Sequence, residues 1–411
     1  MGLDMKTRRK ITDQIARRYQ KASRKQKSQM LDEFVSLSGY HRKYASHLLS
    51  QWGKTRLVRI DGQLVRLKAG NRRGAGAVER RGRKRIYDES VVEALKSLWE
   101  LYDRMCGKRL VVAMRPILRS PELVEELEIG QEVRQKLLGI SAATIDRLLQ
   151  SERKKVCLKG TSHTTRATGA IAARIPVRTF AEQPASPGFF QADLVGHDGG
   201  VARGDFCYTL NATDPATGWC EPRAVLNKAG KWTTEALDWI YTHCPLPIRG
   251  WHTDGGTEFL NAHMERYCSK QGIEFTRSRY YRKNDNCYVE QKNDTLIRRN
   301  VGYLRYHSEQ HCALLNELYD ALRLLANYFY PSMKLIQKHR VGSRLTKRYD
   351  EPKTPYQRVM VSQEVGEQVK QNVRSKLEGL NPIELRCTVD ELAARLIDLV
   401  QHPDQDEGRG R

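Results

Sequence analysis

Apolar positions at helical spacing run through the first 50 residues of the chain. They predict three short helices: one over 11–19, one that starts at a capping box formed by Ser23 and Gln26, and one around 42–49. Gly39 is expected to end the second helix, because glycine readily adopts the left-handed conformation that closes a helix. The N-terminal part of the chain is therefore predicted to be a small helical unit.

The third of these helices carries Arg42 and Lys43 at its start. This layout is typical of a helix-turn-helix, whose last helix enters the major groove of DNA. A helical bundle that does not touch DNA has the same periodicity. The charge of the region favours the DNA-binding interpretation.

Helical periodicity returns over 86–150. Its last segment, LGISAATIDRLL, has a glycine turn followed by Ser141, which predicts a capped helix and a second helix-turn-helix. Thr144 and Arg147 are its candidate DNA contacts. A plain packing helix is the alternative, and the sequence does not separate the two.

Short segments rich in strand-forming residues follow in the middle of the chain. Strands are predicted over 189–195, 206–213, 220–226, 248–252 and 273–278, and helices over 233–243, 258–271 and 288–305. The order β-β-β-α-β-α-β-α predicts an α/β core that begins with a three-stranded antiparallel meander.

Charge changes the picture by pointing to a polyanionic partner. The 411 residues include 71 Lys and Arg against 48 Asp and Glu, a formal net charge of +23. Residues 1–85 hold 24 of these basic and 6 of these acidic residues, so 24 − 6 = +18 lies in the first fifth of the chain. Nucleic acid is the expected partner, and a solvated face that only aids solubility is the alternative.

Several protein classes are disfavoured. The chain has no apolar run near 18 residues, no secretory signal pattern and no CxxC pair among its nine Cys residues. We therefore expect a cytoplasmic protein without membrane segments. His41 and His47 have no Cys pair nearby, so no zinc site is expected either.

Two segments have the composition of linkers. Residues 61–85 are rich in Gly and Arg, and predict a flexible basic linker in which Arg81, Arg83 and Arg85 are candidate DNA contacts. A tether that only touches phosphates is the alternative. Residues 156–184 form a second predicted linker.

Three acidic residues stand at informative places in the predicted core. Asp193 lies within the first strand, on the face opposite Phe190 and Ala192. Asp254 ends the fourth strand before two glycines, where a sharp turn would expose its carboxylate at the edge of the sheet. Glu290 lies beside the apolar stripe of the last helix, so we expect it to point along the sheet rather than into solvent.

Such carboxylates could converge on metal ions. Hard divalent cations prefer oxygen ligands, and two such ions held by carboxylates activate an attacking oxygen and stabilise the leaving oxygen in phosphoryl transfer. Three unrelated surface acids are the alternative interpretation.

These residues lie in segments that resemble a known family. The segments QADLVGHDGG, TLNATDPATGW, HTDGGTEF (252–259), RSRYYRKNDNCYVEQKN (277–293) and GYLRY are similar to the catalytic core of DDE transposases of bacterial insertion sequences, which are related to retroviral-type integrases. The resemblance is specific over about 185–310. One departure is Gly255, where many members have Asn.

The resemblance implies an RNase H-like core in which Asp193, Asp254 and Glu290 are catalytic and bind two Mg²⁺ or Mn²⁺ ions. It also implies a homo-oligomer, at least a dimer, that holds transposon terminal inverted repeats and target double-stranded DNA. The implied activity is 3′-end cleavage at the transposon ends followed by strand transfer. A DNA-binding protein with a catalytically silent core and an RNase H-like nuclease are the alternatives.

Further DNA contacts are predicted near the catalytic helix. Lys283 and Asn286 lie in the loop before this helix, where a mobile segment could contact the scissile strand. Arg298 follows Glu290 and Asp294 at four-residue steps, so it is a candidate phosphate contact or a partner of Asp294 in an ion pair.

The predicted fold class is a multidomain α plus α/β protein. The predicted boundaries are a helix-turn-helix domain over 1–60, a basic linker over 61–85, a second helical DNA-binding domain over 86–155, a linker over 156–184, the RNase H-like core over 185–315 and a C-terminal DNA-binding or multimerisation region over 316–411. The last region includes a basic stretch over 334–348, whose fold the sequence does not reveal.

Overall fold

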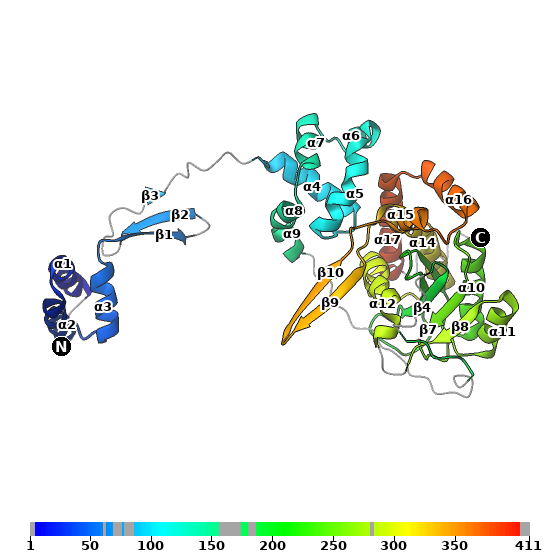
Figure 1. Ribbon diagram of the computed structural model, residues 1–411, viewed down its shortest axis with the longest axis horizontal. Helices are drawn as coiled ribbons and strands as arrows, with labels where there is room; N and C mark the ends of the chain where they lie inside the picture. Colours follow the sequence, from blue (N-terminus) through cyan, green and yellow to red (C-terminus); the bar gives the residue numbers. More distant parts are fainter. Residues whose placement is uncertain are drawn as a thin grey trace. The chain divides into compact units, whose positions relative to one another are not determined.

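The computed structural model describes residues 5–60, 63–68, 76–77, 86–155, 174–179, 186–279 and 283–402 (Figure 1). The chain divides into two compact units, residues 1–85 and 86–411. Within the described ranges, every helix is too short or too polar to cross a membrane.

The first unit contains the three predicted helices, α1 (Met5–Lys21), α2 (Arg24–Ser38) and α3 (Arg42–Gln51). The capping box is present, since the Gln26 side chain accepts a hydrogen bond of 3.0 Å from the backbone N–H of Ser23. Gly39 ends α2 with a φ of 70°. A small core that includes Phe34 and Leu49, both fully buried, holds the helices together.

A hairpin follows that spans the predicted boundary at residue 60, with one strand in the predicted helix-turn-helix domain and the other in the predicted linker. Strands β1 (Thr55–Ile60) and β2 (Gln63–Lys68) pair antiparallel, and the short β3 (Gly76–Ala77) pairs with β2. The prediction of a flexible linker is therefore wrong over 63–68. The linker prediction rests on the Gly and Arg content of the segment. The alternating runs TRLVRI and QLVRLK are separated by Asp-Gly, and this pattern is a strong hairpin signal.

The second unit begins with six short helices. They are α4 (Glu89–Leu101), α5 (Gly107–Arg119), α6 (Pro121–Glu126), α7 (Gln131–Leu138), α8 (Ala142–Leu148) and α9 (Gln150–Lys155). As predicted, Ser141 caps α8, since its Oγ accepts a hydrogen bond of 3.2 Å from the backbone N–H of Thr144.

These helices share one hydrophobic core with helices from the other end of the chain. The core joins side chains such as Leu98 and Leu110 to Leu318 of α14 (Glu309–Phe329) and Leu396 of α17 (Pro382–Gln401). The Tyr330 hydroxyl donates a hydrogen bond of 3.0 Å to the carbonyl of Leu101 across this contact. Residues 86–155 are thus not packed as an independent domain.

The predicted strand order is present in the middle of this unit. The strands are β4 (Phe189–Gly196), β5 (Tyr208–Thr213), β6 (Cys220–Val225), β7 (Gly250–Thr253) and β8 (Glu274–Arg277). They form one sheet in the order β6-β5-β4-β7-β8. The first three are antiparallel, and β7 and β8 run parallel to β4, so β4 is the central strand.

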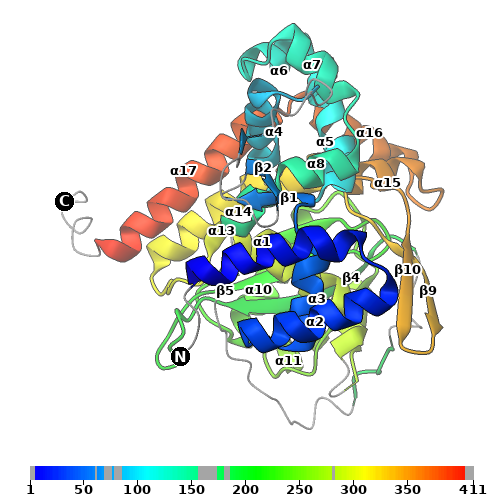
Figure 2. The same ribbon diagram turned by 90° about the vertical axis from the view of Figure 1, so that its left-hand side faces the viewer.

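Helices cover both faces of this sheet. Helices α10 (Gly230–His243) and α11 (Ala262–Gln271) pack on the face of Phe190 and Ala192. The opposite face, which includes Val195, packs against α14 and the segment after β8. Figure 2 shows the same elements after a turn of 90°.

The segment after β8 is predicted as one helix over 288–305 but is divided. It consists of η3 (Lys283–Asn286), α12 (Cys287–Lys292), a π-helix η4 (Asn293–Arg298) and α13 (Arg299–Val301). A π-helical turn inserts one extra residue into the helical repeat, and such turns are frequent at functional sites.

Two asparagines of α14 close the exposed edge of β6. The Asn316 amide accepts from the backbone N–H of Ala224 at 2.8 Å and donates to its carbonyl at 3.2 Å. Asn327 does the same for Cys220, at 2.9 and 2.8 Å. Because these amides occupy the hydrogen-bonding positions of a further strand, they block edge-to-edge pairing of the sheet.

The C-terminal part carries a two-stranded hairpin and helices. The hairpin consists of β9 (Leu335–Val341) and β10 (Arg344–Tyr349), and the helices are α15 (Pro355–Val361), α16 (Glu367–Glu378) and α17. The hairpin projects from the rest of this unit (Figure 1).

Candidate active site

The two predicted aspartates come together at the end of the sheet. Strands β4 and β7 are parallel neighbours in which Ala192 pairs with Thr253. Asp193 and Asp254 each follow directly, with Asp254 just past the last residue of β7, so both acids lie at the same end of this strand pair. Asp254 lies at the carboxyl end of an inner strand, not at the lateral edge of the sheet.

Gln191 ties the helix that carries Glu290 to the same strand. Its side-chain oxygen accepts hydrogen bonds from the backbone N–H groups of Tyr288, at 3.1 Å, and Val289, at 3.4 Å. Its Nε2 donates to the carbonyl of Asp285 at 3.1 Å. Gln191 is fully buried and stands two residues before Asp193, so it fixes the start of α12 against β4.

An ion pair between the exposed Arg279 and the buried Asp285 holds the segment before α12. Asp285 is fully buried and accepts two hydrogen bonds from the Arg279 guanidinium, at 2.8 and 2.9 Å. The adjacent Asn286 donates to the carbonyl of Ala192 at 3.2 Å. Bidentate pairs of this kind fix geometry as well as charge, so Asp285 and Asn286 are held in place directly before α12.

Asn293 contacts the central carboxylate directly. Its Nδ2 donates to Asp193 Oδ2 at 2.7 Å, and its Oδ1 accepts from Asn211 of β5 at 2.8 Å. The other carboxylate oxygen, Asp193 Oδ1, accepts from the backbone N–H of Leu194 at 2.9 Å. Asn293 is the first residue of the π-helix, so this irregular turn begins where the helix meets the site.

Burial and neighbouring carboxylates raise the pKa of Asp193. Burial raises the pKa of Asp193 to about 8, and the nearby Asp254 and Glu290 add to the rise. Burial likewise raises the pKa of Asp254, against the opposing hydrogen bond from the backbone N–H of Gly256. Like charges held this close disfavour the ionised state and favour the binding of a cation.

Glu290 and a fourth acid complete the surroundings. Glu290 is exposed, so the expectation that it is turned away from solvent is wrong. The pKa of Glu258 is raised by burial and further by the charge of Asp254. Glu258 lies before α11, which begins at Ala262, and so belongs to the loop beside Asp254.

The donor set suits a hard cation. Oxygen atoms of three carboxylates, two of them on adjacent strands, are the ligands that Mg²⁺ and Mn²⁺ prefer. In the ranges that the structure describes, no three His, Cys, Asp or Glu side chains are already drawn together tightly enough to enclose an ion. Glu290 is the member that lies out in solvent.

Two of the DNA contacts predicted near α12, Asn286 and Arg298, are buried. Asn286 is buried at the sheet, so the prediction that it contacts DNA is wrong in this conformation. Lys283 is the first residue of η3. The predicted mobile loop is thus held at Asp285 and Asn286.

Arg298 has a structural role instead of the predicted phosphate contact. It is buried and donates to the carbonyl of Gly196 at 2.7 Å, and its guanidinium lies 4.8 Å from the ring centre of Tyr303. The ion pair with Asp294 is also absent, since Asp294 faces Arg299 at 3.7 Å.

The remaining predicted contacts lie elsewhere in the chain. Arg42 and Lys43 are exposed at the start of α3, and Arg42 forms an ion pair with Asp32. Arg147 is exposed on α8, and Thr144 is partly buried there. Arg81, Arg83 and Arg85 lie outside the described residues.

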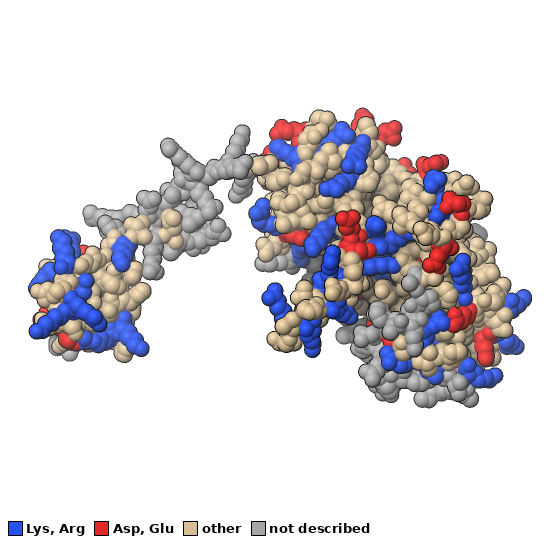
Figure 3. All heavy atoms as spheres, viewed as in Figure 1, with Lys and Arg blue, Asp and Glu red and all other residues tan. Residues whose placement is uncertain are grey.

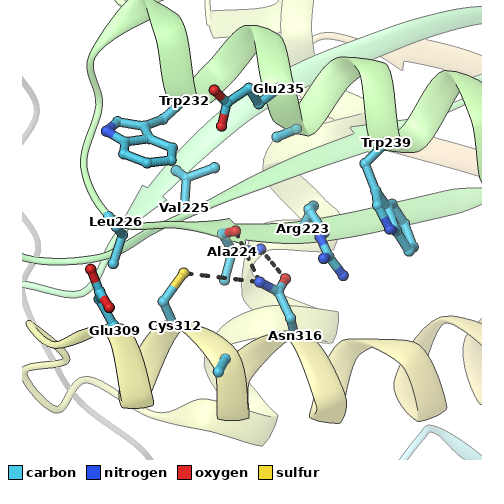
Figure 4. Close-up of a pocket in the computed structure, with 12 residues that line it drawn as sticks. Arg223, Ala224, Val225, Leu226, Trp232, Glu235, Trp239, Glu309, Cys312 and Asn316 are labelled. Atoms are coloured by element: carbon cyan, nitrogen blue, oxygen red, sulfur yellow. Dashed lines mark hydrogen bonds between the residues drawn. The ribbon is translucent and has the colours of Figure 1, made fainter.

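A pocket of about 400 Å³ lies beside the edge of the sheet, between β6, α10 and α14 (Figure 4). Trp232 and Trp239 line it, and the guanidinium of Arg223 lies 4.2 Å from the ring centre of Trp239. None of the three predicted catalytic acids lines this pocket.

Comparisons with known proteins give one close relative. No protein-family model matches the chain. The uncharacterized protein y4rM of Sinorhizobium fredii (strain NBRC 101917 / NGR234) is 38% identical over 357 residues, which cover 87% of this chain and 96% of that protein. Among solved structures, the catalytic core domain of BIV integrase is 14% identical, with a TM-score of 0.29, and the match covers 47% of this chain and 99% of that one. With so low a TM-score, the interpretation of the site rests on the residues of the chain.

Proposed function

We propose that this chain, which belongs to the same family as the uncharacterized protein y4rM, is a DDE transposase that cleaves the 3′ ends of a DNA element and joins them to target DNA. Its catalytic residues would be Asp193, Asp254 and Glu290. The strand order supports an RNase H-like core, because the first strand is central, with an antiparallel pair on one side and parallel strands on the other.

One observation carries the proposal. Asp193 follows Ala192 on β4, Asp254 follows the Thr253 that pairs with Ala192, and Gln191 of β4 caps the helix that bears Glu290. Three acids far apart in the sequence are therefore drawn to one end of the sheet. Asp254 and Glu290 both raise the pKa of Asp193, which supports the same conclusion.

The three carboxylates would hold two Mg²⁺ or Mn²⁺ ions, which when bound supply activation of the attacking oxygen and stabilisation of the leaving oxygen. The chain itself provides the positions. Asn293 orients the Asp193 carboxylate, and Gln191 and the Arg279–Asp285 pair fix the start of the catalytic helix. Positioning and electrostatic stabilisation are the main contributions of a protein to phosphoryl transfer.

The basic N-terminal unit would bind the ends of the element. Residues 1–85 carry a net charge of +18, and Arg42 and Lys43 are exposed on the helix that would enter the groove. Residues 142–148 of α8 would provide a second contact. We further propose that the enzyme acts as a homo-oligomer, because two ends must be held together. Its proposed location is the cytoplasm.

The test is a strand-transfer assay with Mg²⁺ on labelled DNA that carries the ends of the element encoding this chain. Asp193→Asn, Asp254→Asn and Glu290→Gln should each abolish joining and leave end binding largely intact. Asp294→Asn is the matched control, because Asp294 is an exposed acid four residues after Glu290. It should retain activity.

Three outcomes would contradict the proposal. Full joining by any one of the three variants would remove that residue from the catalytic set. Cleavage without joining would indicate a nuclease. Specific end binding without any chemistry in the unmodified protein would indicate a DNA-binding protein with a silent core.

A further inference from the structure

The hairpin formed by β9 and β10 is basic on both of its faces. Residues 335–349 contain five Lys and Arg residues and no Asp or Glu. From Ile336 to Tyr349 every residue is exposed. Figure 3 shows basic side chains on this projecting ribbon, which is labelled in Figure 1.

The pairing register assigns the cations to faces. Lys338 pairs with Lys347, and Arg340 pairs with Leu345, so Lys338, Arg340 and Lys347 share one face, here called face one. Arg344 pairs with Val341, and Arg348 with Gln337, so these two arginines share the opposite face, called face two.

This arrangement is unfavourable unless an anion is nearby. Like charges directly opposite each other destabilise a strand pair, and Lys338 and Lys347 are such a pair. An isolated two-stranded hairpin is only marginally stable in water. The ribbon therefore lacks, within its own residues, the negative charge that would stabilise it.

The base of the hairpin is firmly held, in contrast to its tip. The backbone N–H of Asp350 donates to the carbonyl of Lys334 at 2.9 Å, and Arg358 donates to the Asp350 carboxylate at 2.7 Å. Arg358 also donates to the carbonyl of Ser332 at 2.9 Å. A fixed base gives the exposed ribbon a defined direction.

The ribbon lies near the catalytic helix. The pKa of Cys287, the first residue of α12, is raised by burial and then by Glu290, and Lys338 opposes this rise. Lys338 is thus within electrostatic range of the helix that carries Glu290. Both elements belong to the same compact unit.

We propose that the β9–β10 hairpin inserts into a groove of double-stranded DNA beside the carboxylate site. A surface that lies flat on the DNA backbone needs cations on one face only. A ribbon within a groove has phosphates along both of its edges, and long Lys and Arg side chains from either face can reach them. The major groove is wide enough for a two-stranded ribbon. A second copy of the hairpin is a poor partner, since it offers no acidic residue. This inference rests on the proposed function for its choice of DNA as the partner.

The first experiment measures how salt affects binding of the full-length chain to a labelled duplex of arbitrary sequence, in EDTA. Each phosphate contact contributes about 0.9 to the slope of log K against log salt concentration. Replacing the three cations of face one with Gln should lower the magnitude of the slope by about 2 to 3, and replacing the two of face two should lower it by about 2.

Matched controls remove equal charge from other exposed surfaces. Arg374→Gln with Lys376→Gln is the control for face two, and adding Lys270→Gln gives the control for face one. Both should leave the slope nearly unchanged. Unchanged thermal unfolding of each variant would show that the fold is kept.

A second readout reports on the tip alone. A photoreactive group attached to Ser343→Cys, in the turn of the hairpin, should crosslink to the duplex, and one attached to Ser375→Cys on α16 should not. Crosslinking at the tip together with smaller slopes for both faces supports the inference.

If the slope decreased for the variant of one face only, the ribbon would lie flat on the DNA, and the proposed insertion into a groove would be wrong. Absence of the crosslink, or no change for either face, would overturn DNA contact by the hairpin. Because the assay involves no chemistry, a chain that binds through the hairpin but never joins DNA would contradict only the proposed function.

Discussion

The carboxylate site and the β9–β10 hairpin use charged residues in opposite ways. Around Asp193, the buried Gln191 and the partly buried Asn293 are each held by hydrogen bonds to specific partners. On the hairpin, the charges are exposed and spread over both faces. Catalysis requires a fixed geometry, whereas binding a polyanion requires mainly the number and sign of charges.

The comparison predicts that the cap of α12 matters for rate. Gln191→Ala should lower the rate of strand transfer by about 10- to 100-fold, because residues that orient metal ligands commonly contribute this much. Binding to DNA should be unchanged. The measurement is single-turnover joining as a function of Mg²⁺ concentration, in which a higher Mg²⁺ requirement would distinguish loss of positioning from general damage.

Gln291→Ala is the control for this variant, since Gln291 is an exposed glutamine on the same helix. If both variants lost activity equally, the effect would come from the helix as a whole. If Gln191→Ala joined DNA at the normal rate, the positioning role of Gln191 would be wrong.

The raised pKa of Asp193 predicts a pH-dependent stability. With a folded-state pKa of about 8 and an ordinary value of 3.8, the folded chain holds a proton that the unfolded chain releases. The stability contributed by this group therefore falls as pH rises from about 4 to about 8. In EDTA, Asp193→Asn should raise the free energy of unfolding by about 1 to 3 kcal/mol near pH 8.

This difference should shrink toward about pH 5, where Asp193 of the folded chain is already neutral. Denaturant unfolding of both proteins at the two pH values measures it. A stabilisation that is equal at both pH values would show that charge repulsion at Asp193 is not its cause.

Arg298 and Arg344 sharpen the comparison, because both are cations that the sequence places near DNA. Arg298→Ala should lower the free energy of unfolding by about 1 to 3 kcal/mol, since the carbonyl of Gly196 loses the hydrogen bond from the buried guanidinium. Its affinity for DNA should stay the same. Thermal or denaturant unfolding and duplex binding measure the two quantities.

Arg344→Ala should show the smallest effect on the fold. Its free energy of unfolding should change by less than about 0.5 kcal/mol, because the side chain is exposed. Its affinity for the duplex should fall and its salt dependence should weaken. If Arg298→Ala weakened DNA binding and Arg344→Ala did not, the assignment of Arg298 to the fold and of Arg344 to DNA binding would be wrong.

Much of the sheet could be predicted because its signals are local. The alternation in FFQADLV and the turn residues after Asp254 mark the strand and the strand end that carry the two aspartates. The partners of Gln191 could not be predicted, since Tyr288 and Val289 lie nearly one hundred residues away and contribute only backbone atoms.

The error at Arg298 has a specific cause. The prediction assumed 100° per residue along one continuous helix, but residues 293–298 form a π-helix with more residues in each turn. Side chains after Lys292 therefore point in directions that α-helical spacing does not give. In the β9–β10 segment, closely spaced charges mask the alternation that is typical of a strand. The sequence therefore predicts the charge of this segment but not its hairpin fold.

The most direct test of the central claim is a titration with Mn²⁺ that compares the unmodified chain, Asp193→Asn and Asp294→Asn by electron paramagnetic resonance of free Mn²⁺. If the acids on β4, β7 and α12 form one cation site, Asp193→Asn should bind Mn²⁺ at least about tenfold more weakly than the other two proteins. Equal binding by all three would contradict the assignment of these carboxylates as the metal site.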